Sequence, residues 1–224
     1  TAGVVLESIQ GGAGFIEPKN DYLIKVKKRC EEVGVMLIID EIQPGFGRTG
    51  KLFGFQNYGI VPDIIAIGKG MASGMPVGAF VSSYERMQLL AHNPKMGHIT
   101  TFGGNPVIAA ASLVTLQELL TTNLMEDTLR KERLFRQYLQ HPLIESINGR
   151  GLMLAVIVPS AEIANYVVEY CQDNGLIVYW LLFELRAVRL SPPLTLTDEE
   201  IKEGCDIIIE ALESYRLQCK AIGD

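Results

Sequence analysis

Two unbroken apolar segments, residues 35–39 and 64–67, constrain the fold of this sequence more than any other feature. Neither segment contains a polar side chain, a pattern typical of strands that are buried on both faces of a parallel sheet. Apolar segments at residues 4–6 and 77–81 extend the pattern. We therefore predict an α/β fold in which helices flank a mostly parallel sheet.

The segment between the strands at residues 4–6 and 35–39 is predicted to contain the helix of a strand–helix–strand unit. Its apolar residues repeat at helical spacing from Tyr22 to Val33. Either Asn20 or Asp21 can cap the start of this helix. Gly34 can end it.

The pattern of apolar and charged residues changes near residue 123. Before that point, Asn105-Pro106 predicts a helix start, because a capping residue precedes a proline. After it we expect alternating helices and strands: a charged helix to residue 139, a strand at 152–158, a helix at 162–172, strands near Ile177 and Val188, and a helix from Asp198. We therefore predict a larger α/β part over residues 1–120 and a small α+β C-terminal domain over residues 121–224.

Composition argues against several classes of protein. Twenty Lys and Arg residues against 26 Asp and Glu residues give a net charge of −6, which disfavours a nucleic-acid or anionic-membrane binder. No apolar run is long enough to span a bilayer. The four cysteines have no C-x-x-C spacing, so we expect reduced thiols and a cytoplasmic location. The three histidines are too scattered to indicate a metal site. Because the chain opens on Thr1, we expect a piece of a longer protein.

Three charged residues follow apolar strand segments. Glu7 follows residues 4–6, Asp40 follows residues 35–39, and Lys69 comes shortly after residues 64–67. Ligands of open parallel sheets bind outside the carboxyl ends of the strands, so we expect these side chains at one crevice. Glycines on both sides of Lys69 leave the lysine without bulky neighbours. Each of these residues could also be an ordinary solvated charge at a strand end.

Two nucleotide-binding interpretations were weighed. Residues 45–50 spell G-x-G-x-x-G, but a proline precedes them and no amphipathic helix follows, as the dinucleotide motif requires. Residues 35–41 resemble the apolar run with Asp-Glu of P-loop ATPases. No G-x-x-x-x-G-K-[ST] accompanies that run here, although one could precede Thr1. A P-loop-type ATPase therefore stays a remote alternative.

A lysine and a carboxylate at one crevice suit pyridoxal 5′-phosphate better than they suit a nucleotide. This cofactor has an aldehyde that condenses with a lysine amine. Its pyridine nitrogen stays protonated beside a carboxylate, and the protonated ring stabilises a carbanion on the substrate. Lys69 and Asp40 meet these two requirements. Lys69 must in addition be partly desolvated or lie near positive charge, so that its amine is free near neutral pH.

Four segments together resemble one enzyme family. The segment LIIDEIQPGFGRTG looks like the signature of the class III pyridoxal-phosphate aminotransferases, closest to the ornithine and acetylornithine aminotransferases. The other three look like the family's lysine segment, phosphate-contacting loop and substrate-arginine segment: residues 67–70 with 75–79, residues 100–106 and residues 189–194. The matches follow the family's order and spacing over nearly the whole chain. The resemblance implies that residues 1–120 are the C-terminal part of a large cofactor-binding domain whose N-terminal part is absent from this chain.

The resemblance implies a role for each cofactor-binding residue. Lys69 would hold pyridoxal phosphate covalently and then move a proton between the substrate carbon and the cofactor. Asp40 would pair with the pyridine nitrogen, and Gln43 would donate a hydrogen bond to the phenolic oxygen. Thr101, together with Thr100, would bind the phosphate of the cofactor held by the other subunit. The active unit would then be a homodimer with sites at its subunit interface.

The resemblance also implies two substrate-binding residues. Arg189 would bind a substrate carboxylate as a bidentate pair, and Glu7 would be a carboxylate that faces the site. Many ornithine-type relatives have a glutamate at the position of Gly12, which pairs with the arginine that matches Arg189. That pair cannot form here, and the effect of the change on substrate choice is open.

The function implied by these motifs is transamination. We expect the terminal amino group of an ornithine-like donor, N-acetyl- or N-succinylornithine or ornithine, to move to 2-oxoglutarate, as in arginine biosynthesis. Another class III reaction is the alternative: a 4-aminobutyrate or other ω-amino acid aminotransferase, an aminomutase or a decarboxylase, because fold and cofactor do not fix the reaction. A catalytically silent subunit is a further possibility that Lys69 and Asp40 argue against.

Overall fold

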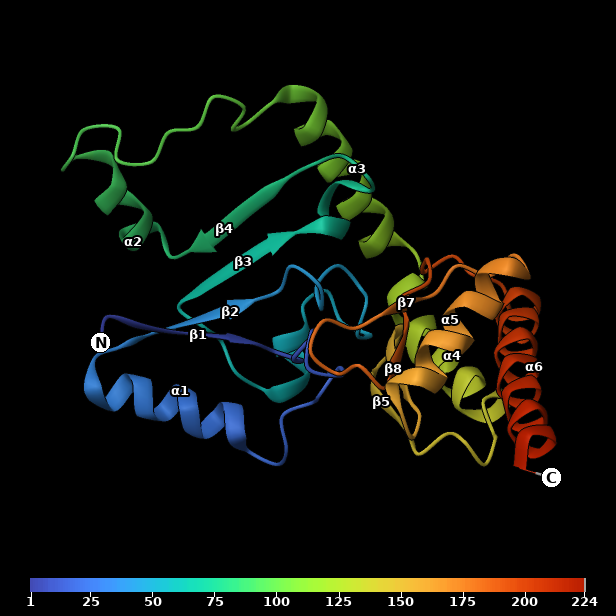
Figure 1. Ribbon diagram of the computed structural model, residues 1–224. Coiled ribbons are helices and arrows are strands. Elements are labelled where there is room, and N and C mark those ends of the chain that lie inside the picture. The colour runs from blue at the N-terminus through green and yellow to red at the C-terminus, as the bar shows by residue number, and fades with distance from the viewer. Residues whose placement is uncertain (224) are drawn as a thin grey trace. The chain divides into compact units, whose positions relative to one another are not determined.

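The computed structural model describes residues 1–223 of the chain, with side chains as far as Gln218. The described chain divides into two compact units (Figure 1). Unit 1 comprises Thr1–Ser8, Pro18–Gly47 and Lys51–Asn123. Unit 2 comprises Ile9–Glu17, Arg48–Gly50 and the described chain from Leu124 onward. Two short segments inside the expected 1–120 part therefore group with unit 2.

Unit 1 is built on one sheet of four strands. They are β1 (Gly3–Glu7), β2 (Met36–Asp40), β3 (Ile64–Gly68) and β4 (Gly78–Ser82), and they lie side by side in chain order (Figure 1). The first three strands are parallel, and β4 is antiparallel to β3. The prediction of a mostly parallel sheet is confirmed.

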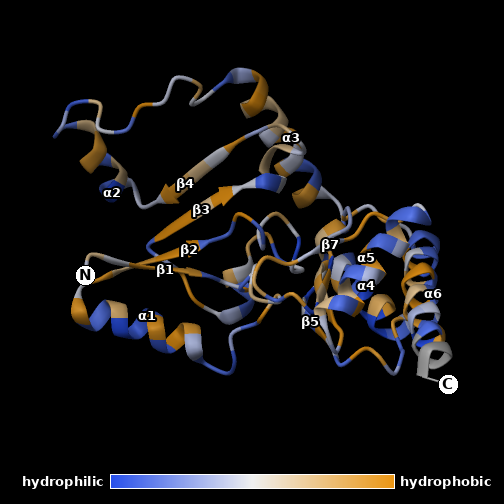
Figure 2. Cartoon of the chain, in the orientation of Figure 1, coloured by the Kyte–Doolittle hydropathy of each residue, from blue (hydrophilic) through white to orange (hydrophobic). Residues whose placement is uncertain are grey.

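Burial of the central strands differs between the two faces of the sheet. Leu37 and Ile39 of β2 are fully buried against Leu23 and Cys30 of the first helix. Ile38, on the other face of β2, is only half-buried. In Figure 2 the ribbons of β2 and β3 are mostly orange, as the sequence indicates. The expected burial on both faces is therefore seen only in part, because the helix α1 (Tyr22–Val33) and its neighbours cover one face of β2.

The helices of unit 1 show how well local capping rules apply. They are α1 (Tyr22–Val33), α2 (Tyr84–Gln88) and α3 (Pro106–Thr121), with 3₁₀ turns η1 (Gly54–Tyr58), η2 (Lys69–Ala72) and η3 (Leu89–Ala91). Asn105 caps α3 as predicted, because its side-chain oxygen accepts hydrogen bonds from the N–H groups of Val107 and Ile108. Asp21 makes no capping bond; its carboxylate pairs with Lys25 at 2.9 Å instead.

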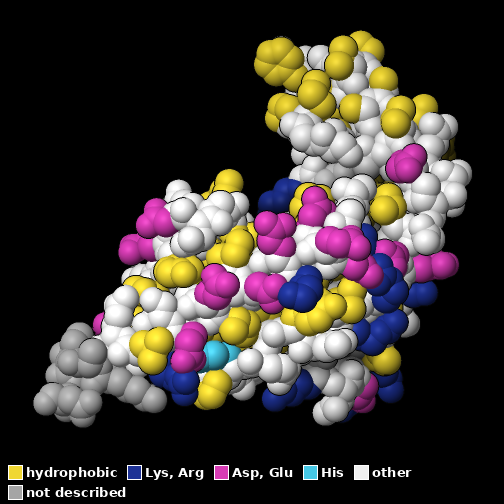
Figure 3. Space-filling view, turned by 90° about the vertical axis from the view of Figure 1, so that its right-hand side faces the viewer, with side chains coloured by type: hydrophobic (Ala, Val, Ile, Leu, Met, Phe, Trp, Pro, Cys, Tyr) yellow, Lys and Arg dark blue, Asp and Glu magenta, His cyan; other side chains and the backbone are white. Residues whose placement is uncertain are grey.

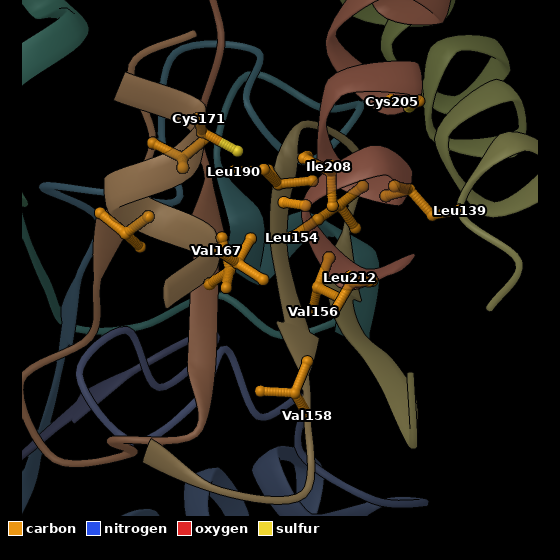
Figure 4. Close-up of a cluster of buried hydrophobic side chains, with 14 of the residues drawn as sticks. Leu139, Leu154, Val156, Val158, Val167, Cys171, Leu190, Cys205, Ile208 and Leu212 are labelled. Carbon is orange, nitrogen blue, oxygen red and sulfur yellow. The ribbon is translucent and has the colours of Figure 1, made fainter. Parts of the chain in front are cut away.

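Unit 2 is a second, antiparallel sheet with helices. The sheet has the order β5 (Ser146–Arg150), β6 (Met153–Ile157), β8 (Ala187–Leu190), β7 (Tyr179–Trp180). Its helices are α4 (Leu124–Tyr138), α5 (Ala161–Asp173) and α6 (Asp198–Gly223). Apolar side chains of β6, β8, α5 and α6 form the core between them (Figure 4). The elements expected after residue 123 are therefore present, and β5, whose sequence is polar, was not predicted.

The cysteines of the core agree with the expectation of reduced thiols. Cys30, Cys171 and Cys205 are buried and free, and Figure 4 shows two of them in the core of unit 2. Burial raises the pKa of the Cys171 thiol and that of the Cys205 thiol to about 12, so both stay protonated. Cys219 lies outside the described side chains. Among the described residues no single helix is long and apolar enough to cross a membrane; only α3 and α4 taken together reach that length and composition.

The outer face of unit 2 carries charges of both signs. Figure 3 shows Lys and Arg side chains interspersed with Asp and Glu on this face. Ion pairs of unit 2 include Arg130 with Asp198 at 2.7 Å and Arg216 with Glu213 at 2.7 Å. This face therefore has mixed charge rather than a basic patch of the kind that binds nucleic acid.

Candidate active site at the carboxyl ends of the parallel strands

The structure places the three charged residues predicted at strand ends along one edge of the unit 1 sheet. Glu7 lies opposite Asp40 in the register of β1 and β2, and Asp40 lies opposite Ala66 in that of β2 and β3. Lys69 directly follows β3 and begins η2. Glu7 and Lys69 are exposed, and Asp40 is half-buried. Because all three strands are parallel, their carboxyl ends meet at this edge.

The backbone at Lys69 is unusual. Its φ angle is 44°, in the left-handed region that few residues other than glycine adopt and that is often found at functional sites. The preceding Gly68 is buried, and a Cβ atom there would lie 3.1 Å from the carbonyl oxygen of Val77. Among the described residues the Lys69 amine has no hydrogen-bond or ion-pair partner. The chain thus holds a free amine on a tightly packed turn.

The two carboxylates that end β2 have different surroundings. Asp40 accepts a hydrogen bond from the N–H of Ile42 at 2.9 Å, which orients its carboxylate at the sheet edge. Glu41 is fully buried, and it accepts hydrogen bonds from the N–H groups of Gly54 at 2.6 Å and Phe55 at 2.8 Å. Burial raises the pKa of Glu41, although these two hydrogen bonds lower it in part. Sequence reasoning missed Glu41, and its only signal was the second carboxylate after the apolar run.

Asp40 and Lys69 fit the requirements of pyridoxal phosphate. The cofactor needs a carboxylate for its ring nitrogen and a free amine for its aldehyde. One Asp40 oxygen is fixed by a backbone N–H, and among the described residues the other has no hydrogen-bond partner. The Lys69 amine lies on the end of the neighbouring strand. Among the described residues no group of His, Cys, Asp and Glu could hold a metal ion.

The glycine-rich segment after β2 makes turns. Phe46, Gly47 and Gly50 have φ angles of 57°, 85° and 86°, and the N–H of Phe46 donates to the carbonyl of Leu52 at 2.6 Å. The short turn η1 follows, and no amphipathic helix does. The segment therefore lacks the strand–turn–helix context of a dinucleotide site. It contains Gln43, which is half-buried and, among the described residues, has no hydrogen-bond partner.

The two threonines predicted to bind phosphate lie in the loop before α3. Both Thr100 and Thr101 are exposed. Thr100 lines a pocket of about 740 Å³ in unit 1, together with aromatic side chains and residues of α3. Neither Lys69 nor Asp40 is among the residues that line this pocket. The chain therefore does not bring the threonines into the same pocket as its own lysine.

Arg189 belongs to unit 2, on β8, and is half-buried. Its guanidinium carbon lies 5.1 Å from the centre of the Tyr179 ring. Among the described residues no carboxylate forms an ion pair with it. The carbonyl of Gly12 accepts a hydrogen bond from the N–H of Phe183 at 3.0 Å, and a Cβ atom at position 12 would lie 3.0 Å from the Phe183 ring. A glutamate at position 12 would therefore require Phe183 to move.

Comparisons with known proteins show the family to which the chain belongs. The family model described as "Aminotransferase class-III" matches residues 1–212. A putrescine aminotransferase of Pectobacterium atrosepticum is 39% identical over 218 residues, which cover 92% of this chain and 46% of that protein. An acetylornithine aminotransferase of Caldanaerobacter subterraneus is 36% identical over 218 residues, which cover 95% of this chain and 54% of that protein.

Solved structures show the same fold. The ornithine aminotransferase of Toxoplasma gondii matches with a TM-score of 0.87 and 33% identity, over 96% of this chain and 51% of that chain; its description notes partial occupancy of pyridoxal phosphate at the active site. The N-acetylornithine aminotransferase of Stenotrophomonas maltophilia matches with a TM-score of 0.85 and 28% identity, over 97% and 57% of the two chains. The chain spans about half the length of these relatives. The chain belongs to the class III aminotransferases, a family of enzymes that use pyridoxal 5′-phosphate.

Proposed function

We propose that this chain is part of a pyridoxal-phosphate transaminase that moves the terminal amino group of an ornithine-like donor to 2-oxoglutarate. The donors that we favour are N-acetylornithine, N-succinylornithine and ornithine. The observation that carries the proposal is the placement of Lys69 and Asp40 on neighbouring strand ends, with the lysine amine free of partners among the described residues. Putrescine is the second candidate donor, because one relative bears that name.

Asp40, Gln43 and Lys69 have different roles in the proposed reaction. Bound pyridoxal phosphate supplies an aldehyde that condenses with amines and a protonated ring that withdraws electrons from the substrate carbon. Asp40 keeps the proton on the ring nitrogen, and Gln43 donates a hydrogen bond to the phenolic oxygen. Lys69 would hold the cofactor through Nζ. When its amine is free, it would carry a proton to and from the substrate carbon.

The assembly that we propose is a homodimer. Thr100 and Thr101 bind the phosphate of the cofactor held by the other subunit, and residues 1–120 form part of the cofactor-binding domain. Two observations support an active unit larger than this chain. The threonines do not line a pocket with Lys69 or Asp40, and α3 exposes Val107, Leu113 and Val114 by more than half of their surface. Figure 3 also shows hydrophobic side chains gathered over the upper part of that view.

The lysine provides the first test. In the full-length protein Lys69→Ala should abolish the absorption band of the lysine-bound cofactor and lower the rate of transamination by about 10³-fold or more, because it removes both the covalent attachment and the proton carrier. Lys51→Ala, which changes another exposed lysine of unit 1, is the matched control and should behave like the wild type. An active Lys69→Ala variant would contradict the mechanism.

The donor is identified by titration. Adding N-acetylornithine, N-succinylornithine, ornithine and putrescine in turn to the full-length protein should bleach the cofactor band at the lowest concentration for the true donor. 2-Oxoglutarate should then restore the band. If 4-aminobutyrate or another ω-amino acid, added in the same way, bleaches the band and none of these four donors does, the ornithine-like assignment is wrong. If a donor yields an isomerised or decarboxylated product, transamination itself is wrong.

A further inference from the structure

Arg189 has an aromatic neighbour to which the proposed reaction assigns no role. We propose that Tyr179 is a specificity-determining residue that orients the Arg189 guanidinium for an incoming substrate carboxylate. The inference rests on the proposed function, in which Arg189 binds that carboxylate. Tyr179 acts through Arg189, so it is a positioning residue.

The strand register brings the two side chains together. Tyr179 of β7 and Arg189 of β8 are direct partners in the antiparallel pairing, so their side chains lie on the same face of the sheet. The guanidinium carbon is 5.1 Å from the ring centre, within the ~6 Å range of cation–π attraction. On the other side, Arg189 pairs with Ala155 of β6, which has no polar group to compete for the guanidinium.

The charge of Arg189 is not neutralised within the described chain. Three carboxylates of unit 2 pair with other arginines: Glu184 and Glu145 with Arg186 at 3.1 Å, and Asp198 with Arg130 at 2.7 Å. Among the described residues none forms an ion pair with Arg189. The guanidinium is therefore unpaired within the described chain and available to a ligand carboxylate.

An aromatic ring is a better partner than a carboxylate for orienting a guanidinium that must bind a substrate. A carboxylate binds the N–H edge of a guanidinium and would have to leave before a substrate could use that edge. A ring contacts the flat face of the guanidinium, so the N–H groups in its plane stay available for a bidentate carboxylate. Tyr179 can thus restrict the rotamers of Arg189 without occupying the bonds that a substrate needs.

The strand that carries Arg189 is also held at its end. The Arg48 guanidinium donates hydrogen bonds to the carbonyl oxygens of Pro192, three residues beyond Arg189, and of Leu152 at 3.3 Å. Burial lowers the pKa of Arg48 to about 10, yet the group stays charged at neutral pH. The backbone after β8 is therefore anchored, and the contact with Tyr179 fixes the side chain that projects from it.

The test measures the binding of a carboxylate without turnover. Glutarate, an unreactive dicarboxylate, is titrated into the full-length protein by calorimetry. Tyr179→Leu removes the ring and should weaken glutarate binding about two- to fivefold, the usual size of an exposed cation–π contact. Tyr179→Phe keeps the ring and should bind like the wild type. Trp180→Leu alters the neighbouring residue of the same edge strand and should also bind like the wild type.

Every result decides the proposal. If wild type and Tyr179→Leu bind glutarate equally well, the proposal is wrong. It is also wrong if Tyr179→Phe or Trp180→Leu loses as much affinity for glutarate as Tyr179→Leu does. Arg189→Leu must abolish the glutarate site, because otherwise the measured site is a different one and the proposal is wrong. Failure of the proposed transamination would be seen separately, in the donor titration.

In an active enzyme Tyr179→Leu should raise KM for 2-oxoglutarate by the same factor and leave kcat unchanged. A general loss of structure would not change KM alone.

Discussion

Consecutive residues can have opposite roles, and Asp40 and Glu41 are an example. Successive side chains at a strand end point in different directions. Asp40 lies at the edge of the sheet. The Glu41 carboxylate is buried in the interior and accepts hydrogen bonds from the N–H groups of Gly54 and Phe55. Gly54 must be glycine, because a Cβ atom there would lie 2.4 Å from the Ser8 hydroxyl oxygen. Glu41 therefore fixes the segment that follows Asp40, and it does so through backbone hydrogen bonds.

Glu41→Gln tests this role through stability. Glutamine offers one acceptor oxygen in place of two, so one buried N–H loses its partner and the free energy of unfolding should fall by about 1–3 kcal/mol. Because burial raises the pKa of Glu41, the native state binds its proton more tightly than the unfolded chain does. The stability that Glu41 contributes is then fully present below pH 4.5, the ordinary pKa, and decreases as the pH rises through the raised pKa.

Urea unfolding of the full-length protein between pH 4 and pH 8 measures this difference. The advantage of the wild type over Glu41→Gln should shrink as the pH increases. Glu118→Gln, at an exposed position of α3, is the control and should show no such trend. A gap that widens with pH would mean that the buried carboxylate favours its charged form, which contradicts the assigned direction.

Elements of unit 1 are joined at Asp63, just before β3. Its carboxylate accepts hydrogen bonds from the N–H of Leu37 in β2 at 2.9 Å, from Lys27 of α1 at 3.0 Å and from Arg86 of α2 at 2.7 Å. Desolvation by burial raises the pKa of Asp63, but the hydrogen bonds from Leu37 and Lys27 and the nearby positive charges outweigh it, so the pKa is lowered. One carboxylate therefore links two helices to the sheet.

Asp63→Asn should destabilise unit 1 by about 1–3 kcal/mol at pH 7, because it removes the charge from hydrogen bonds to two cations and a backbone N–H. A lowered pKa means that this stability is present above the ordinary pKa of 3.8 and is lost as the pH falls through the native value. Chemical unfolding from pH 7 down to pH 3 should show a gap between variant and wild type that closes only in acid. Asp21→Asn, which breaks the exposed pair with Lys25, should change stability little at any pH. An equal effect of both variants would refute the special role of Asp63.

On the scale of the whole molecule, we propose that a second copy of the chain completes the site. Lys69, Asp40 and Gln43 belong to unit 1, and none of the three lines the pocket of that unit that Thr100 lines. A homodimer would allow the threonines of one subunit to serve the cofactor of the other. A closed two-fold assembly would satisfy both sites at once.

Mixed dimers test this arrangement. Lys69→Ala should be inactive, and Thr100→Val/Thr101→Val should be poorly active at limiting cofactor, because two hydroxyl hydrogen bonds to an anion are lost. When the two full-length variants are unfolded and refolded together, half of the dimers should be hybrids with one intact site each. Activity should then rise to about a quarter of the wild-type value. No recovery, with hybrids demonstrated by a subunit tag, would show that the threonines act within their own subunit.

Local features of the chain were determined by the sequence alone. The parallel strands could be predicted because unbroken apolar runs are typical of strands in a parallel sheet, although the structure fully buries only one face of β2. The start of α3 at Asn105-Pro106 and the end of α1 at Gly34 followed from capping rules that involve only neighbouring residues. The placement of Asp40 and Lys69 at one sheet edge also followed, because all parallel strands present their carboxyl ends on the same side.

Features that depend on distant residues were decided only by the tertiary structure. β5 has a polar sequence, and it becomes a strand because β6 offers hydrogen bonds along its whole length. Arg48 binds the Pro192 carbonyl 144 positions away, and the Tyr179 ring meets Arg189 through the register of two strands. The sequence encodes short-range preferences that can be read residue by residue, whereas such contacts arise only when the folded chain brings remote segments together.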